Sequence, residues 1–395
     1  MNMKSVLLRG PILTNSGYGV HTRQIAKWLF RDVGPRLGLD ISTEPLPWGK
    51  THWLLNPDLE DGLVGEVMQA ANNKKSFYDV TIQVQLPNEW NPYLGGFNIG
   101  VTAGVETDKC NPAWVDNINR MDLVIVPSEF TKQTFLNTGE VKTPIVVIPE
   151  SYPEVFDVLA SEDMKPIDLK LKTKFNFLLV GQLTGTNVDN DRKNIPYTIK
   201  WMAELFDGQP DVGIVVKTNC GAATELDKRN VQSILSKLIS EVSKPTGPTF
   251  YLLHGHMTDE EMKGLYTHPD IKALVNLTHG EGYGLPILEA AACDLPVIVT
   301  DWSGHLQFLK EGKYIGVDYI MGDIHESRVD NQIFMPGVKW AYPTEVDSKR
   351  RLSKFKSSPV MPKAWAVELG KKVREKFSFS AVSKLYTEAL ESQLK

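Results

Sequence analysis

The sequence predicts an α/β protein built from two doubly wound domains. Short runs of β-branched apolar residues alternate with stretches of helical periodicity, and nothing repeats at a fixed period. The 395 residues exceed what one hydrophobic core usually supports, which favours two domains of ordinary size. With 42% hydrophobic and 23% charged residues, the chain can bury enough apolar surface to offset the entropy of folding.

The first half of the chain opens with a strand, a glycine-bearing loop and a helix. Lys4–Leu8 is the expected strand, and the loop Asn15-Ser16-Gly17-Tyr18-Gly19 follows it. Ile25, Trp28 and Leu29 then have the i, i+3, i+4 spacing of a helix face. Further strands of a parallel sheet are expected at residues 81–86, 98–102, 123–126 and 145–148.

A change of composition separates the two halves. Residues 151–174 are polar and charged with two prolines, and a fresh strand begins at Phe175. We therefore expect a first domain over residues 1–165 and a second over 166–375. The strands expected in the second domain are residues 175–180, 213–217, 249–253, 273–277 and 297–300. Ligands of such sheets bind at the carboxyl ends of the strands, so two facing sheets place the expected site in the cleft between them.

Composition also bears on location and on partners. No apolar run approaches the roughly 18 to 20 residues that cross a bilayer, and Met1–Gly10 does not have the apolar core of a signal peptide. The odd, widely spaced Cys110, Cys220 and Cys293 make a disulfide framework improbable, which favours a reducing cytoplasm. A net charge of −5 without a dense basic run makes nucleic acid an unfavoured partner.

The segment from His279 to Ala290, HGEGYGLPILEA, carries the sharpest motif. Its three glycines let the backbone approach a ligand closely, and Pro286 suits the first turn of a helix. The amides at such a helix start form an anion site that is reinforced by the helix dipole, and a diphosphate fits it. Glu281 lies in the loop and can reach toward a sugar, whereas Glu289 lies on the helix and can accept from ribose hydroxyls.

This segment closely resembles the E-x7-E signature of the retaining GT-B nucleotide-sugar glycosyltransferases of the glycosyl transferases group 1 family. The resemblance implies the GT-B fold, with two Rossmann-like domains that face a cleft, the second of which binds the donor. It implies transfer of a sugar from a nucleotide diphosphate sugar, with retention of anomeric configuration. It also implies that the last helix, residues 376–395, crosses back onto the first domain.

Other residues extend the resemblance over nearly the whole chain. Gly181-Gln182-Leu183 and the following Asp191-Arg192-Lys193-Asn194 look like the phosphate-binding loop of the family, in which a basic pair neutralises the donor diphosphate. Lys193 carries over directly, and Arg192 is the substitute for the arginine that usually stands where this chain has Gln182. The remaining donor-site residues that the resemblance implies are Gly17, Gly19, Lys217, Tyr283, Gly284, Leu285 and Glu289.

The mechanistic hypothesis assigns separate roles to the two glutamates. The helix start, with Arg192 and Lys193, stabilises the leaving diphosphate, while Glu281 orients the sugar and Glu289 holds the ribose. Many relatives place a histidine of the first domain near the sugar; the matching stretch of this chain has Glu106 instead. Glu106 is the candidate for the second catalytic residue, and a capping or surface role is the alternative.

No metal and no cofactor other than the donor are expected. Asp189-Asn190-Asp191 resembles a metal-binding D-x-D triplet, but a polar turn explains it better, because Arg192 and Lys193 can neutralise phosphate directly. His254 and His256 lack an evident third ligand for zinc.

Several questions stay open at the level of sequence. The acceptor can be a glycan, a lipid carrier, a metabolite, a protein or a modified nucleobase, and the oligomeric state is not indicated. Residues 320–356 have no assignment beyond a lid or a loop insertion. The competing functions are a non-catalytic nucleotide-sugar-binding module and a cofactor-free nucleotide-sugar epimerase of GT-B fold.

Overall fold

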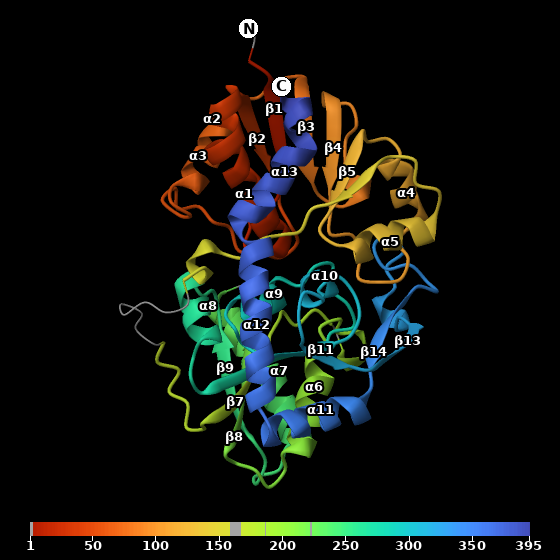
Figure 1. Cartoon of the computed structure of the whole chain (residues 1–395). Coiled ribbons are helices and arrows are strands. Elements are labelled where there is room, and N and C mark those ends of the chain that lie inside the picture. The colour runs from red at the N-terminus through yellow and green to blue at the C-terminus, as the bar shows by residue number, and fades with distance from the viewer. Residues whose placement is uncertain (1–2, 159–166, 186, 222) are drawn as a thin grey trace. The chain divides into compact units, whose positions relative to one another are not determined.

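The chain divides into two units, each built on its own parallel sheet (Figure 1). The computed structural model describes residues 3–158, 167–185, 187–221 and 223–395. Unit 1 comprises Met1–Ser151, Asn331–Met335 and Phe379–Lys395, and unit 2 comprises Tyr152–Asp330 and Pro336–Ser378. The division falls at Ser151 rather than at residue 165, because Tyr152 and Phe156 are buried in the core of unit 2.

The sheet of unit 1 has six parallel strands in the order β2-β1-β3-β4-β5-β6. Its strands are β1 (Ser5–Gly10), β2 (Asp40–Pro45), β3 (Tyr78–Val84), β4 (Gly95–Val101), β5 (Leu123–Val126) and β6 (Ile145–Val147). The sequence did not predict β2. This edge strand, DISTEP, has one strongly apolar residue, Ile41, and β1 is its neighbour in the sheet.

Helices cover the apolar face of this sheet. Buried side chains of β1 and β3, such as Leu8 and Ile82, form one core cluster with Trp28 of α1 and with Val382 and Leu390 of α13. The final helix α13 therefore belongs to unit 1. The helices of unit 1 are α1 (Gly17–Trp28), α2 (Gly34–Leu37), α3 (Leu63–Ala70), α4 (Pro112–Ile118), α5 (Glu129–Thr138) and α13 (Phe379–Leu394), with a π-helical turn at Leu29–Val33.

Unit 2 repeats this architecture. Its strands are β7 (Phe175–Val180), β8 (Val212–Thr218), β9 (Thr249–His254), β10 (Ile271–Asn276), β11 (Val297–Thr300) and β12 (Ile315–Val317), in the order β12-β11-β10-β7-β8-β9. All neighbouring strands are parallel. The predicted α/β class with two parallel sheets is therefore confirmed, and each strand predicted for unit 2 lies within two residues of its expected ends.

Helices cover both faces of the unit 2 sheet. Along β7, Leu178 faces one buried cluster, while Phe177 and Leu179 face another, as the alternation of side chains in a strand requires. The first cluster contains side chains of α8 (Asp259–Tyr266), α9 (Leu285–Ala292), α10 (Leu306–Leu309) and α12 (Val360–Phe377). The second contains side chains of α6 (Ile195–Leu205), α7 (Glu225–Val242) and α11 (Glu345–Ser357).

The stretch 320–356, which the sequence left unassigned, contains an antiparallel hairpin. Strand β13 (Tyr319–Asp323) pairs with β14 (Lys339–Pro343), and a 3-10 turn at Glu326–Arg328 lies in the long connection between them. Hairpin strands are usually joined by two to five residues, whereas residues 324–338 connect these two strands. The sequence therefore has no local hairpin signal.

Among the described residues, none of the helices combines the length and the apolar character that a membrane span requires.

Candidate functional site

The loop between β10 and α9 has the backbone geometry that an anion site needs. Gly284 caps α9 with a φ of 97°, in the left-handed region that favours glycine. Leu285 begins the helix, and Pro286 follows in its first turn. The amides of Gly284 and Leu285 therefore stand at the positive end of the helix dipole.

Glu281 is buried and ion-paired with both basic residues of the preceding loop. The Nζ atom of Lys193 lies 2.7 Å from each of its carboxylate oxygens, and Arg192 Nη1 lies 3.3 Å from Oε2. Arg192 Nη1 also donates to the carbonyl of Gly280 at 2.6 Å. Two cations and one carboxylate leave this cluster with one net positive charge, beside the helix start.

The charge of Glu281 follows from this pairing. Burial by itself raises the pKa of the carboxyl, but the neighbouring Lys193 ammonium and Arg192 guanidinium outweigh it and hold the pKa at about 2. Glu281 is therefore ionised at neutral pH. An ionised carboxylate accepts hydrogen bonds from hydroxyls and cannot donate a proton.

A chain of buried hydrogen bonds fixes the backbone of Glu281. Its N–H donates to Ser303 Oγ at 2.8 Å, and Ser303 Oγ lies 3.3 Å from His305 Nδ1. His305 Nε2 lies 2.8 Å from the carbonyl oxygen of Thr300 and must carry the proton, because a carbonyl only accepts. Nδ1 of the neutral ring is then an acceptor for the Ser303 hydroxyl.

The segment carrying Ser303 is strained and tightly packed. Ser303 has a φ of 92°, a region that costs a non-glycine residue about 1–3 kcal/mol and that is commonest at functional sites. Gly304 N donates to the carbonyl of Glu281 at 2.8 Å. A Cβ at position 304 would lie 1.9 Å from the carbonyl oxygen of Gly282, so only glycine fits there.

Glu289 lies on α9 in a separate polar group. Tyr266 Oη donates to Glu289 Oε2 at 2.9 Å. Burial raises the pKa of Glu289 to about 7, while the Tyr266 hydrogen bond and the Lys217 ammonium oppose the rise and Asp259 adds to it. Lys217, at the end of β8, has its pKa lowered by burial and partly restored by Glu289 and Glu261.

The loop before α6 is held by Asp191. Its Oδ1 accepts from the N–H and the hydroxyl of Thr184, at 3.0 and 2.8 Å, and its Oδ2 accepts from Ile195 N at 3.0 Å. The carbonyl of Arg192 accepts from His279 N at 2.9 Å, which joins this loop directly to the Glu281 loop. Both oxygens of Asp191 therefore have structural roles.

Unit 1 contains the remaining predicted residues. Gly17 and Gly19 lie in the first turn of α1, where a Cβ at Gly19 would meet the carbonyl oxygen of Thr14 at 2.0 Å and one at Gly17 would meet nothing. Between them, Tyr18 Oη lies 2.9 Å from Thr102 Oγ1 and accepts from Ala103 N at 3.1 Å. Glu106 is half-buried and lies in the loop that follows β4. Burial raises the pKa of Tyr18, and the charge of Glu106 adds to this rise.

The predicted residues thus fall into three groups. Glu281, Arg192 and Lys193 are in contact beside Gly284 and Leu285, Glu289 and Lys217 interact in a second group, and those of unit 1 form a third. The ring of Tyr283 instead packs against Phe308 in the core of unit 2, 5.4 Å between centroids.

Sequence reasoning missed the roles of Tyr266, Ser303 and His305. The only local signal is the run Thr300–Gly304, which follows a buried strand and contains Ser303 and its neighbour Gly304. Their partners are distant in sequence.

Among the described residues, no group of three or more His, Cys, Asp or Glu side chains is placed to hold a metal ion. His254 instead pairs with Asp227, with Nε2 2.7 Å from Oδ2.

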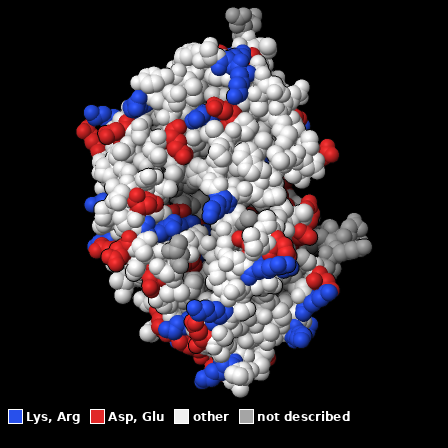
Figure 2. Space-filling model, turned by 180° about the vertical axis from the view of Figure 1, so that it is seen from behind, with Lys and Arg blue, Asp and Glu red and all other residues white. Residues whose placement is uncertain are grey.

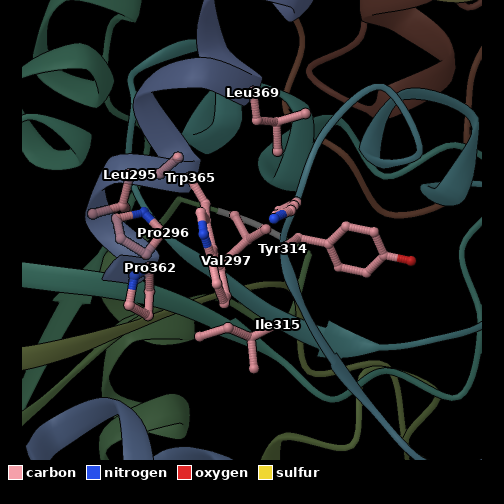
Figure 3. A pocket seen from close by; sticks show the side chains of 10 residues that line it. Leu295, Pro296, Val297, Tyr314, Ile315, Pro362, Trp365 and Leu369 are labelled. Carbon is pink, nitrogen blue, oxygen red and sulfur yellow. The ribbon is translucent and has the colours of Figure 1, made fainter. Parts of the chain in front are cut away.

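Other surface features lie apart from these groups. A shallow crevice is lined mostly by apolar residues in and next to β11, β12 and α12, where Trp365 lies near Val297 and Ile315 (Figure 3). None of the predicted site residues lines it. Positive and negative side chains are interspersed over the face shown in Figure 2. The chain has nearly equal numbers of the two kinds, 43 Lys and Arg residues and 48 Asp and Glu residues.

Comparison with known proteins gives a family for part of the chain. Residues 190–326, which include Arg192, Lys193, Glu281 and Glu289, match the family described as Glycosyl transferases group 1. No curated protein sequence matches the chain.

Solved structures with the same fold span the full length of the chain. Anabaena HepE in complex with UDP and glucose is 13% identical, with a TM-score of 0.64 over 98% of this chain and 100% of that one. A glycosyltransferase from Rickettsia africae is 14% identical, with a TM-score of 0.63 over 100% of both chains. Sucrose-phosphate synthase from Thermosynechococcus elongatus is 15% identical, with a TM-score of 0.60 over 99% of both chains. At these identities the likeness shows the fold alone, and that fold is GT-B.

Proposed function

We propose that this chain, whose residues 190–326 carry the glycosyl transferases group 1 segment, transfers a sugar from a nucleotide diphosphate sugar with retention of anomeric configuration. The family match and the GT-B fold support glycosyl transfer. HepE, which shares the fold, was crystallised with UDP-glucose, and this makes a uridine donor the first to test. The acceptor stays open among glycans, lipid carriers, metabolites, proteins and modified nucleobases.

The observation that carries the proposal is the cluster of Glu281, Lys193 and Arg192 beside the start of α9. Loss of a nucleoside diphosphate puts negative charge on the leaving oxygens, and preorganised positive groups stabilise that charge. The cluster keeps one net positive charge after Glu281 is counted, and the helix start adds its dipole. Glu281, ionised with a pKa of about 2, accepts a hydrogen bond from a sugar hydroxyl and so orients the ring.

We further infer that transfer needs no divalent metal. Arg192 and Lys193 take the place that a cation holds on the diphosphate in metal-dependent enzymes. Asp191, the last residue of the D-x-D-like triplet, has both oxygens occupied by Thr184 and Ile195, which supports this inference. A cytoplasmic location also stays a proposal, supported by three free cysteines.

A thermal-shift screen against UDP-, GDP-, ADP- and CDP-sugars, with and without a chelator, tests donor binding. A ligand that binds only the folded state raises its melting temperature. We expect one nucleotide to give a clear shift that the chelator leaves unchanged and that Glu289→Ala reduces. Glu241→Gln, an exposed glutamate change in α7, is the control and should keep the full shift. Loss of the shift in the presence of chelator would refute the inference that no divalent metal is needed.

Product analysis separates the competing functions. Incubation with the bound donor and a panel of acceptors should release the nucleoside diphosphate and form a glycoside, whose anomeric configuration NMR reads directly. Retention is the expected result. Donor binding without turnover would indicate a binding module, and an altered sugar without acceptor would indicate an epimerase. Either result would overturn the proposal.

A further inference from the structure

His279, at the start of the Glu281 loop, packs against the hairpin β13–β14. Its imidazole is 4% exposed and stacks on Trp340, with ring centroids 4.7 Å apart and an interplanar angle of 13°. Tyr342 lies on the same strand, 4.8 Å away at 58°. Trp340 itself is fully buried. A buried side chain packed against two rings has little rotational freedom, so the hairpin determines where His279 lies.

Hydrogen bonds fix the orientation of the ring. His279 Nδ1 lies 2.8 Å from the carbonyl oxygen of Ala341, and Ala341 N donates to the carbonyl of His279 at 3.1 Å. The carbonyl only accepts, so Nδ1 carries the proton. Burial lowers the pKa of the imidazole to about 4, which leaves the ring neutral at neutral pH.

The connection between the two strands also holds the second loop of the site. Ser327 Oγ accepts from Asn190 Nδ2 at 2.9 Å and from Asn187 Nδ2 at 3.2 Å. Asn190 lies two residues before Arg192, and Arg192 O accepts from His279 N. One inserted segment therefore contacts both the loop that carries Glu281 and the loop that carries Arg192 and Lys193.

We propose that His279 is a positioning residue, clamped by the hairpin β13–β14, that keeps Glu281 aligned on Lys193 and Arg192 for sugar transfer. The catalytic part of this inference rests on the proposed function. Through His279, the hairpin holds the loop whose next residues are Gly280 and Glu281. Misplacing a catalytic group by about 1 Å can reduce the rate about 100-fold, so such a clamp can matter.

Two substitutions separate the hydrogen bond from the ring stack. His279→Phe keeps an aromatic ring and loses the donor to Ala341, whereas His279→Asn keeps an amide donor near Nδ1 and loses the stack. We expect both to lower kcat by about 10- to 100-fold while the Kd of the nucleoside diphosphate without sugar stays near its wild-type value. Ile320→Ala, at an exposed position of β13, is the matched control and should change neither quantity.

Two measurements test the clamp without activity. Nitrogen NMR of the wild-type protein should show a neutral His279 protonated on Nδ1. Hydrogen exchange at residues 280–284 should be faster in both variants than in wild type and in Ile320→Ala, because the clamp restrains that backbone. An Nε2-protonated ring, or unchanged exchange in folded variants, would overturn the clamp. A wild-type protein that fails to transfer sugar while keeping these two signatures would overturn the proposed function instead. Faster exchange with wild-type kcat would show that positioning for transfer is wrong.

Discussion

Lys193 Nζ lies 2.7 Å from both carboxylate oxygens of Glu281, although the two residues are 88 positions apart in the chain. Both side chains are largely buried, with 13% and 6% of their surface exposed. Burying two charges costs free energy that their attraction only partly returns. The pair is therefore better explained by a role in binding charge than by a contribution to stability, and it can be tested on both grounds.

Replacing Lys193 alone should lower the free energy of unfolding more than replacing Lys193 and Glu281 together. Lys193→Met leaves the Glu281 carboxylate buried with Arg192 alone, and we expect it to lower the free energy of unfolding by about 3 kcal/mol. The double change Lys193→Met with Glu281→Gln should recover part of that loss, as urea denaturation at neutral pH will measure. Lys174→Met, in an ion pair whose lysine is 85% exposed, is the control and should cost no more than about 1 kcal/mol. Strictly additive losses would show that the pair is not coupled.

The raised pKa of Glu289 predicts a pH dependence of stability. A folded-state pKa of about 7, above the ordinary value, means that the protonated carboxyl favours the folded state. Its contribution is complete below about pH 4.5 and is lost as the pH rises through about 7. Between those values, the wild type should lose roughly 1–3 kcal/mol relative to Glu289→Gln, measured by denaturation at about pH 5 and about pH 8. A constant difference would contradict the raised pKa.

Tyr266 should tune the charge of Glu289. Its hydroxyl stabilises the carboxylate at 2.9 Å, so Tyr266→Phe should raise the pKa of Glu289 further. We expect nucleotide affinity at neutral pH to fall about fivefold and to recover at higher pH, with kcat unchanged, as calorimetry at several pH values will show. Tyr197→Phe removes a comparable hydrogen bond to Asp189 at the surface and is the control. Loss of kcat at unchanged affinity would contradict this role.

The strain at Ser303 predicts an inverted order of two substitutions. Ser303→Ala and Ser303→Gly both remove the hydroxyl that accepts from Glu281 N, but only glycine adopts a φ of 92° without strain. The glycine variant should therefore be more stable than the alanine variant by about 1 kcal/mol in thermal or urea unfolding. At Ser240, inside α7, the order should reverse, because glycine disfavours a helix by about 1 kcal/mol. The same order at both positions would refute the strain.

Local patterns predicted the framework of both sheets. Runs such as Phe175–Val180 and Val297–Thr300 are predominantly apolar, and the strands have those bounds in the structure. A strand that is buried on both faces is a nearly continuous apolar run, so its own residues are enough to predict it. The edge strands β2 and β12 and the hairpin β13–β14 were missed, because these segments are short, polar or mixed and their pairing partners determine their conformation.

By itself, the sequence determined the fold class, the glycine at position 284 and the family resemblance of the E-x7-E segment, because each depends on residues that are neighbours in the chain. Only the tertiary structure decided which charges meet. Lys193 with Glu281, Tyr266 with Glu289 and His279 with Trp340 are contacts across long sequence separations. The pKa values of the glutamates follow from those contacts and from burial, neither of which a single sequence specifies.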